Sequence, residues 1–391
     1  MKVCDLTQFY SPLSGGVKRY VHEKANYVRE RTSDEHILIV PGERTERTGD
    51  ERARIYSIRS PVISKTARYR ALLDLRAVAQ ILEHEQPDII ESSDPYQVGW
   101  KAISFGRAAK IPVVAFYHSH FPEAYLRSAS KLLGHRMGKS LMSAAKRYVR
   151  KMYNRFEATC VPSEPLQQVL VEWGVRNTRL VPLGVNTDNF APDPDDGPEM
   201  RKTLGIGPGQ KLLLYVGRLA PEKNTSALFE AFRILMTRRP GEFRLVVIGD
   251  GPQREQLRQL EAETQAVNWI QYSTDPLELA RSYRAADLFV HPGTQETFGL
   301  VALESQACGT PVVGIRGSRL DGIILHDQDG WAAENSAEAL AGAIQQFSER
   351  DLRAMGDIAA KGAAEYSWPR VFERLFCIYR EVCANYPLVR P

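Results

Sequence analysis

Apolar residues come in short runs along this chain, and the stretches between the runs carry apolar residues at helical spacing. Short apolar runs bounded by turn residues are typical of strands buried in a parallel sheet. We expect helices between most of these runs. In the first half of the chain, strands are predicted over residues 3–6, 37–40, 89–91, 113–117, 158–161 and 179–181.

The same alternation restarts after a stretch rich in proline and aspartate, residues 191–198, which suits a link between domains. Strands alternating with helices indicate parallel sheets covered on both faces. The sequence therefore predicts an α/β protein of two doubly wound domains, residues 1–188 and 189–369, followed by a helical segment, residues 370–391. In the second domain, strands are predicted over residues 211–216, 243–248, 270–272, 288–291 and 311–315.

The composition is that of a folded, globular chain. It has 391 residues, of which 43% are hydrophobic and 25% charged, enough for two domains of ordinary size. No run of about eighteen uncharged apolar residues occurs, so we expect no transmembrane helix. The first residues are typical of a strand rather than of a signal peptide. Five cysteines without metal-type spacing indicate reduced thiols and a cytoplasmic protein.

Positive charge is concentrated in the first half of the chain, although the formal net charge is only +4. Residues 124–156 carry nine basic residues and no acidic one, interspersed with leucine, methionine and tyrosine. A basic, partly amphipathic helical segment of this kind can lie on an anionic membrane surface. A pair of helices with solvated basic faces explains the pattern equally well. Nucleic acid is a less suitable partner, because no nucleic-acid-binding motif accompanies the charge.

Two glutamates, Glu296 and Glu304, lie eight positions apart around a glycine. The preceding strand stops at His291-Pro292 and a helix is predicted from about Phe298, which leaves backbone N–H groups free to bind an anion. Glu296 precedes this helix, and Glu304 is predicted about two turns inside it, on roughly the same face. Carboxylates accept from hydroxyls, so the pair suits a ligand with hydroxyls at both ends and phosphate between, such as a nucleotide sugar. The alternative is an ordinary αβ unit with a solvated glutamate.

A second loop of interest follows the strand predicted at residues 211–216. Gly217 allows the chain to turn, and Pro221 is well tolerated at a helix start. Arg218 and Lys223 then extend from one short loop. A departing diphosphate needs fixed positive charge, which is most effective where water is excluded. The alternative is a pair of solvated cations at a helix start, but the helix dipole opposes cations there.

These two loops resemble the retaining family 4 glycosyltransferases of GT-B architecture. The resemblance covers residues 283–314, where E-x7-E is followed by a small-residue helix and G-T-P-V-V, and the string Y-V-G-R-L-A-P-E-K-N that ends at Asn224. It implies two Rossmann-like domains that face each other across a cleft. The sugar nucleotide is then expected mainly on the second domain and the acceptor on the first. It also implies that the C-terminal helix, residues 370–391, crosses back onto the first domain.

The resemblance further implies roles for individual residues. Glu304 corresponds to the residue that holds the ribose hydroxyls, and Glu296 to the one that binds hydroxyls of the donor sugar. Arg218 and Lys223 correspond to the pair that stabilises the departing diphosphate. The remaining contacts to the sugar, phosphate and nucleotide are expected from Phe298, Gly299, Leu300, Val301, from Gly16 in a glycine turn, and from Gly249 in the nucleotide wall.

A histidine of the first domain completes the expected site. The string A-F-Y-H-S-H, which ends at His120, resembles the family segment whose first histidine contacts the donor sugar, and that histidine is His118 here. His120 stands where many relatives have aspartate or asparagine. The chain also lacks the glycine that the family usually has beside the base, near residues 270–275.

We predict no essential metal and no cofactor besides the sugar-nucleotide substrate. Asp327 and Asp329 form a D-x-D string like the metal motif of another glycosyltransferase architecture, but an Asp-Gly turn explains it better. The overall hypothesis is a retaining, metal-independent glycosyltransferase that moves a hexose from a GDP-mannose or UDP-glucose type of donor to a lipid, glycan or small hydroxyl acceptor. It is expected in the cytoplasm, with peripheral binding to the inner face of the membrane left open. The alternatives are a non-catalytic nucleotide-sugar-binding scaffold, or a sugar-nucleotide epimerase or phosphorylase of the same architecture.

Overall fold

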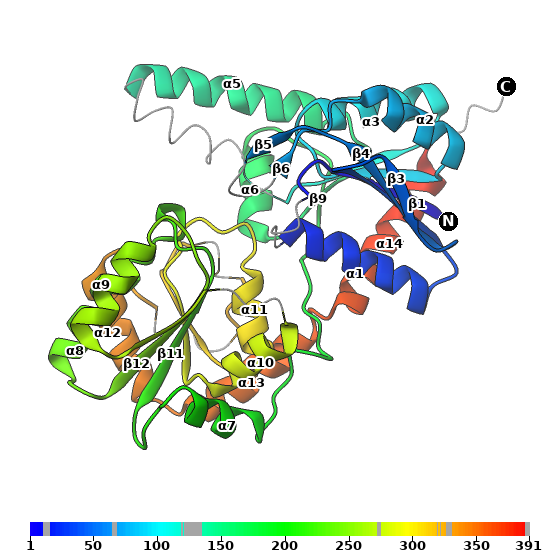
Figure 1. Ribbon diagram of the computed structural model, residues 1–391. Coiled ribbons are helices and arrows are strands. Elements are labelled where there is room, and N and C mark those ends of the chain that lie inside the picture. The colour runs from blue at the N-terminus through cyan, green and yellow to red at the C-terminus, as the bar shows by residue number, and fades with distance from the viewer. Residues whose placement is uncertain are drawn as a thin grey trace. The chain divides into compact units, whose positions relative to one another are not determined.

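The computed structural model of the chain forms two compact units. One unit comprises Met1–Leu183 and Trp368–Pro391, and the other comprises Gly184–Ser367. The chain is described over residues 1–10, 16–64, 69–118, 120, 135–271, 275–318, 320, 322–325 and 331–387. Figure 1 labels the elements of both units.

The division between the units lies at residues 183 and 184, whereas the sequence placed it after residue 188 and expected the link at residues 191–198. Val185 already belongs to the second unit, because it forms a parallel bridge with Ser367 and its N–H donates to the carbonyl oxygen of Tyr366 at 2.9 Å. Residues 191–198 are likewise held inside that unit, where Arg284 Nε donates to the carbonyl oxygen of Ala191 at 2.7 Å.

The first unit is built on an eight-stranded sheet in the order β10-β9-β8-β7-β1-β2-β4-β3. All neighbouring strands are parallel except β3, which pairs antiparallel with β4 at one edge. A two-stranded ribbon, β5 and β6, follows β4. The strands are β1 (Lys2–Leu6), β2 (Glu35–Gly42), β3 (Glu46–Gly49), β4 (Ala53–Arg59), β5 (Val62–Ser64), β6 (Tyr69–Arg70), β7 (Ile89–Ser92), β8 (Val113–Phe116), β9 (Thr159–Val161) and β10 (Thr178–Leu180).

Helices cover both faces of this sheet (Figure 1). Helices α1 and α14 pack side by side on one face, so the C-terminal helix lies on the first unit. Helices α2, α3, α6 and the end of α5 bury their apolar residues against the other face. The helices are α1 (Gly16–Arg31), α2 (Leu75–Glu85), α3 (Gln97–Ala109), α5 (His135–Tyr153), α6 (Glu164–Glu172) and α14 (Trp368–Asn385).

A buried polar network lies between the sheet and helices α1 and α14. Lys24 is fully buried, and its Nζ lies 2.9 Å from Asp5 Oδ1, 3.0 Å from Glu91 Oε1 and 2.9 Å from the Tyr379 hydroxyl. His36 Nε2 lies 2.8 Å from the other oxygen of Asp5. Burial acts to raise the pKa of Asp5, but the charges of Lys24 and His36 lower it to about 2. The network therefore joins two strands, α1 and the C-terminal helix through one buried charge.

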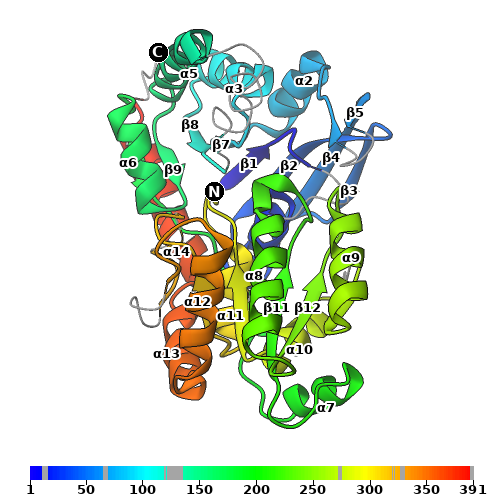
Figure 2. The same cartoon turned by 90° about the vertical axis from the view of Figure 1, so that its left-hand side faces the viewer.

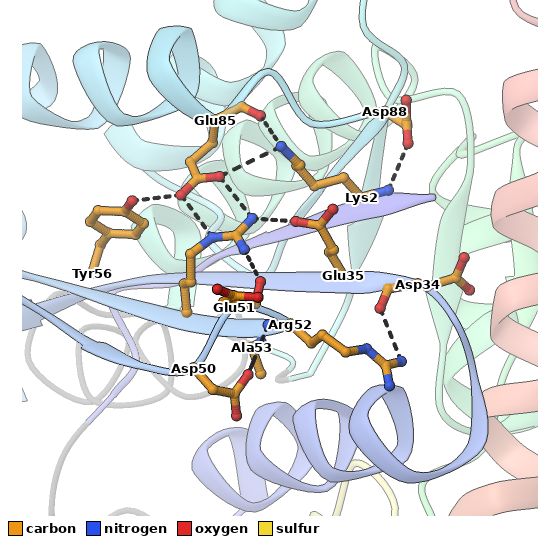
Figure 3. A network of polar contacts seen from close by, with 11 residues as sticks. Lys2, Asp34, Glu35, Asp50, Glu51, Arg52, Ala53, Tyr56, Glu85 and Asp88 are labelled. Carbon is orange, nitrogen blue, oxygen red and sulfur yellow. Dashed lines mark hydrogen bonds and ion pairs between the residues drawn. The ribbon is translucent and has the colours of Figure 1, made fainter.

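A second polar network fixes the outer strands of the same sheet (Figure 3). Arg54 donates from Nε and Nη2 to the two oxygens of Glu85, each at 2.9 Å, and from Nη2 to Glu35 Oε2 at 2.6 Å. The Tyr56 hydroxyl and Lys2 also contact Glu85, the latter through the carbonyl oxygen at 2.7 Å. The bidentate pairing ties β4 to the end of α2, and Lys2 ties the start of β1 to the same glutamate.

The second unit is a doubly wound domain on a five-stranded parallel sheet, in the order β13-β12-β11-β14-β15. In Figure 2, helices α8, α9 and α12 lie in front of this sheet, and α10 and α11 lie behind it. The elements are α7 (Asp196–Thr203), β11 (Lys211–Val216), the 3-10 turn η1 (Pro221–Lys223), α8 (Thr225–Arg238), β12 (Phe243–Ile248), α9 (Arg254–Thr264), β13 (Val267–Ile270), α10 (Pro276–Ala285), β14 (Leu288–His291), α11 (Leu300–Ala307), β15 (Val312–Gly314), α12 (Ala337–Ser348) and α13 (Leu352–Ala364).

The predicted fold class of two doubly wound domains is confirmed, and β11, β12 and β14 have the bounds expected from the sequence. The prediction for β13 is wrong by two to three residues, because Val267–Ile270 rather than residues 270–272 pair with β12. The sequence also missed β3 and β4. Their polar and arginine-rich residues hide the strand pattern, and β4 is held by the buried Arg54–Glu85 pair rather than by apolar packing alone.

Candidate functional site

Two loops of the second unit meet at the carboxyl ends of neighbouring strands. β11 pairs with β14, and each is followed by one of the loops that the sequence marked. Asn224 Nδ2 donates to the carbonyl oxygen of Pro292 at 2.9 Å, and Lys223 Nζ lies 2.5 Å from Glu296 Oε1. Ligands of open α/β sheets bind at the carboxyl ends of the strands. The structure therefore brings Lys223 and Glu296 into one place suited to a ligand.

Glu296 is an ionised carboxylate in a shielded position. Its side chain is only 12% exposed, and His291 Nε2 lies 3.4 Å from the same Oε1 that Lys223 contacts. Burial acts to raise the pKa of Glu296, but the charge of Lys223 and the hydrogen bonds from His291 and Lys223 outweigh it and lower the pKa to about 2. The carboxylate is thus negative at neutral pH and can only accept hydrogen bonds, as a group that binds hydroxyls must.

The helix that follows Glu296 presents free backbone donors. Gly299 has a φ of 93° and caps α11, and a Cβ there would lie 2.3 Å from Leu320 Cδ2, so glycine is required. No described residue accepts a hydrogen bond from the N–H groups of Gly299, Leu300 or Val301. Free N–H groups at a helix N-terminus bind anions. The backbone donors expected from the sequence are therefore present at this turn, and their binding of an anion stays a prediction.

Glu304 lies closer to the start of this helix than the sequence predicted. Because left-handed Gly299 cannot lie inside a helix, α11 begins at Leu300, and Glu304 falls in its second turn rather than two turns inside. Glu296 lies in the loop before the helix and not on its face. The Glu304 side chain is buried, and its Oε2 accepts from the Tyr283 hydroxyl at 3.2 Å. Phe298 is buried too, and its ring centroid lies 6.3 Å from that of Tyr366.

Arg218 and Gly249 lie on neighbouring loops of the same unit. Arg218 is 58% exposed, forms an ion pair with Glu222, and makes no described contact with Glu296. Exposed pairs of this kind are weak, so the guanidinium can exchange its partner for a ligand. A Cβ at Gly249 would lie 2.0 Å from the carbonyl oxygen of Gly217. Gly249 therefore has a packing role whether or not it lines a nucleotide site.

In the first unit, His118 follows β8 at the carboxyl edge of the sheet. Its ring stacks on Phe116 with centroids 4.2 Å apart and lies 4.7 Å from the ring of Tyr20. Burial, assisted by the charge of Lys24, lowers the pKa of His118 to about 3, so the ring is neutral. Its Nε2 is buried and has no partner among the described residues. A neutral imidazole with one open nitrogen can exchange a hydrogen bond with a sugar hydroxyl.

The other sequence-predicted residues of the first unit are only partly described. Gly16 is the exposed first residue of α1, and the preceding Ser14 and Gly15 lie outside the described residues. His120 is held by Tyr117, whose hydroxyl lies 3.1 Å from His120 Nδ1. Residues 124–134 of the basic segment and residues 272–274 beside the expected base site also lie outside the described residues.

Sequence reasoning missed three polar residues near these sites. His291 was noted only as the end of a strand, and Asn224 only as the end of a motif, yet both contact the second loop. Asp94 follows β7 and is buried. Burial raises the pKa of Asp94 to about 7, although hydrogen bonds from the backbone of Tyr96, Gly99 and Gln8 act to lower it. The one available signal was position, since His291 and Asp94 lie at or just after the carboxyl end of a strand and Asn224 ends the loop that follows β11.

Asp327 and Asp329 lie outside the described residues. Within the described ranges, no three histidine, cysteine, aspartate or glutamate side chains gather as metal ligands would, and the absence of an essential metal stays a prediction. No helix in that part of the chain has both the length and the apolar character to cross a bilayer.

Comparison with known proteins places these observations in a family. Residues 14–189 match the model of Glycosyltransferase Family 4, and residues 196–362 match that of Glycosyl transferases group 1. A GDP-mannose-dependent alpha-(1-6)-phosphatidylinositol dimannoside mannosyltransferase of Mycobacterium tuberculosis is 32% identical over 95% of this chain and 93% of its own length. An alpha-monoglucosyldiacylglycerol synthase of Streptococcus pneumoniae is 32% identical over 68% of this chain and 60% of its own length.

Solved structures show the same fold at lower identity. Sucrose-phosphate synthase from Thermosynechococcus elongatus superposes with a TM-score of 0.75 at 20% identity, covering 98% of this chain and 99% of that one. Anabaena HepE in complex with UDP and glucose gives a TM-score of 0.72 at 19% identity, with 97% and 99% covered. With the full-length relative and the paired motifs, these matches establish that the chain is a glycosyltransferase and belongs to glycosyltransferase family 4.

Proposed function

We propose that this enzyme transfers a mannose residue from GDP-mannose, with retention of configuration, to a hydroxyl of a lipid-linked acceptor. The donor is inferred from relatives in which GDP-mannose is named, the M. tuberculosis mannosyltransferase and a GDP-mannose-dependent alpha-mannosyltransferase of Corynebacterium glutamicum that is 25% identical over 98% of this chain. The acceptor class is inferred from relatives whose names include phosphatidylinositol and diacylglycerol.

One observation carries the donor part of the proposal: a buried carboxylate and a lysine are paired beside free helix N–H groups. Lys223 and Glu296 lie 2.5 Å apart, and the N–H groups of Gly299, Leu300 and Val301 follow on the same loop. A sugar attached to a diphosphate presents hydroxyls beside negative charge. The Glu296 carboxylate can accept hydrogen bonds from the sugar hydroxyls. Lys223 and the helix N–H groups can bind the negative diphosphate beside them.

The proposed chemistry relies on electrostatics. The bond between the sugar C1 and the β-phosphate oxygen breaks, the acceptor oxygen bonds to C1 on the same face, and the acceptor proton passes to the departing phosphate. Lys223 and Arg218 would stabilise the negative charge that develops on the diphosphate, and Glu296 would orient the sugar. Removing one such group typically costs roughly 100- to 1,000-fold in rate. No metal is required in this scheme, because the charge is met by side chains and helix N–H groups.

In the second unit, Glu304 would hold the ribose hydroxyls and Gly249 would form part of the nucleotide wall. From the first unit, Gly16 would contact the diphosphate and His118 the donor sugar. Glu304 is buried but close to the start of α11, and His118 is neutral with an open Nε2. Both properties suit hydrogen bonds to hydroxyl groups.

The experiment is a ligand panel followed by a transfer assay. GDP, UDP, ADP and TDP are tested for their effect on the melting temperature, which rises only if the folded protein binds the ligand. GDP is expected to give the largest shift, and radiolabelled GDP-mannose is expected to give a mannosylated lipid with membrane extract. Lys223→Ala should lower transfer at least about 100-fold in a protein that still folds, although its melting temperature should fall because Glu296 loses its partner. Absence of a shift with every nucleotide, or near-normal transfer by Lys223→Ala, would contradict the donor site.

The same assay separates the alternatives. A non-catalytic nucleotide-sugar-binding scaffold would show a higher melting temperature with GDP-mannose but would release no GDP from it. An epimerase would convert GDP-mannose to another sugar nucleotide without an acceptor. A transferase releases GDP in proportion to the mannose that appears on the acceptor.

We also propose that helix α5 places the enzyme peripherally on the inner, cytoplasmic face of a membrane. Its described residues include exposed Lys139, Lys146, Arg147, Arg150 and Lys151 and no acidic residue. Met137 is 52% exposed on the same helix. A basic helix with exposed apolar side chains suits an anionic lipid surface, where a lipid-linked acceptor is found. Co-sedimentation with vesicles tests this proposal.

A further inference from the structure

His291 is the last residue of β14 and is buried beside Glu296 in the proposed donor site. Its side chain is 5% exposed, and its Nε2 lies 3.4 Å from Glu296 Oε1. Its Nδ1 is buried and has no partner among the described residues. A buried nitrogen without an acceptor is better left unprotonated, because a stranded N–H loses a hydrogen bond to water. The Nε2–H tautomer is therefore favoured, and it places the ring proton on the nitrogen that lies nearest Glu296.

Two donors converge on one oxygen of the Glu296 carboxylate. Lys223 Nζ and His291 Nε2 both contact Oε1, at 2.5 Å and 3.4 Å. No described residue donates a hydrogen bond to Oε2. The carboxylate is thus held through one oxygen, and the other is left for a ligand.

Gly293 provides the space that this arrangement needs. A Cβ at this position would lie 2.9 Å from His291 Cε1 and 3.4 Å from Glu296 Oε1. The first distance is shorter than van der Waals contact allows, so a side chain at residue 293 would move the imidazole. The absence of a Cβ therefore lets the ring and the carboxylate lie together over the backbone.

We propose that His291 is a positioning residue, which holds Glu296 in the orientation that binds the hydroxyls of the donor sugar when Lys223 turns to the diphosphate. The inference deepens the proposed function and rests on it. In the absence of donor, Lys223 neutralises Glu296. Once a diphosphate binds, the ammonium is drawn to a second and larger negative charge, and its hold on Glu296 weakens. His291 does not leave, because it is fixed at the end of a buried strand.

The test compares binding of the whole donor with binding of its nucleotide part. Affinities for GDP and for GDP-mannose are measured by titration calorimetry in wild type, His291→Leu, His291→Gln and Gly293→Ala. His291→Leu should weaken GDP-mannose binding and kcat/KM about 10- to 100-fold, the range for losing a hydrogen bond to a charged group. Its GDP affinity should stay within about 3-fold of wild type, because GDP has no sugar for Glu296 to bind.

The other variants separate positioning from packing. Glutamine carries an N–H at about the reach of Nε2, so His291→Gln should recover most of the GDP-mannose affinity. Gly293→Ala should weaken GDP-mannose binding while His291 is still present. His84→Leu, at an exposed histidine of α2 in the other unit, is the matched control and should change neither affinity. Melting curves identify any variant that fails to fold, and if His291→Leu fails then the other two variants decide.

Three outcomes would overturn the inference. These are wild-type affinity for GDP-mannose in His291→Leu, an equal loss of GDP and GDP-mannose binding, and a loss in His291→Gln as large as in His291→Leu. If wild type binds neither GDP nor any other nucleoside diphosphate, the proposed function itself fails. That result differs from failure of the inference alone, in which wild type binds GDP-mannose and His291→Leu binds it equally well.

Discussion

Replacing Lys24 by methionine removes the single ammonium of the buried network in the first unit. Methionine keeps a flexible stem of similar length, so the change deletes the charge and its hydrogen bonds more than the packing. Three contacts are lost together: those to Asp5 Oδ1, Glu91 Oε1 and the Tyr379 hydroxyl. The expected result is a large loss of stability of the first unit, with the C-terminal helix affected directly.

The magnitude follows from which charges remain. Asp5 is ionised, since its pKa is lowered to about 2, and its side chain is 2% exposed. Without Lys24 this carboxylate is buried with only His36 and no lysine to balance it. Removing one partner of a buried ion pair typically costs about 3–5 kcal/mol. Domains are stable by only about 5–15 kcal/mol in total, so the variant is expected to lose about a fifth of its stability or more.

The assay must report on the first unit alone. Tryptophan fluorescence would not do so, because both units contain tryptophans. Hydrogen exchange read by mass spectrometry of peptides from β1, β7 and α14 gives the opening free energy of the first unit. Lys151→Met is the matched control, because Lys151 is exposed on α5 of the same unit and makes no described contact. It should stay within about 0.5 kcal/mol of wild type.

A second substitution separates charge from packing. Asp5→Asn combined with Lys24→Met removes the ammonium together with the Asp5 carboxylate and leaves only Glu91 of its two acidic partners, so the double variant should be more stable than Lys24→Met alone. The reasoning fails if Lys24→Met changes the opening free energy by less than about 1 kcal/mol, or if the double variant is the less stable of the two. Unchanged exchange in α14 would show that the network does not hold the C-terminal helix.

Two further predictions concern Asp94 and helix α5. The folded pKa of Asp94 is raised from 3.8 to about 7, so the native state keeps a proton that the unfolded chain loses. Stability should therefore fall as pH rises from about 4 to about 7, by up to about 4 kcal/mol. Asp94→Asn should flatten that decline in urea titrations at several pH values, and a decline of the same size in the variant would contradict the assignment. Changing Lys139, Arg147 and Lys151 together to glutamine should weaken binding to phosphatidylserine-containing vesicles roughly 100-fold, at about 1 kcal/mol per basic residue; equal binding to neutral phosphatidylcholine vesicles would refute the electrostatic role.

Local pattern determined most of the elements and both loop motifs of this chain. The strands β11, β12 and β14 follow from short apolar runs, because a strand buried on both faces must be apolar along its whole length. The paired loops around Lys223 and Glu296 follow from residue order, and their likeness to family 4 glycosyltransferases could be read without coordinates.

Only the tertiary structure decided which of these residues meet. Lys223 contacts Glu296 because β11 lies next to β14 in the sheet, and strand order depends on long-range pairing that no local window contains. The same holds for Lys24, whose partners come from three distant parts of the chain and which reads as an ordinary helical lysine in the sequence. The position of His291 beside Glu296 is likewise a result of the fold, because the two residues meet in a buried site. Burial and proximity change the energy of a charge, and both are properties of the folded chain.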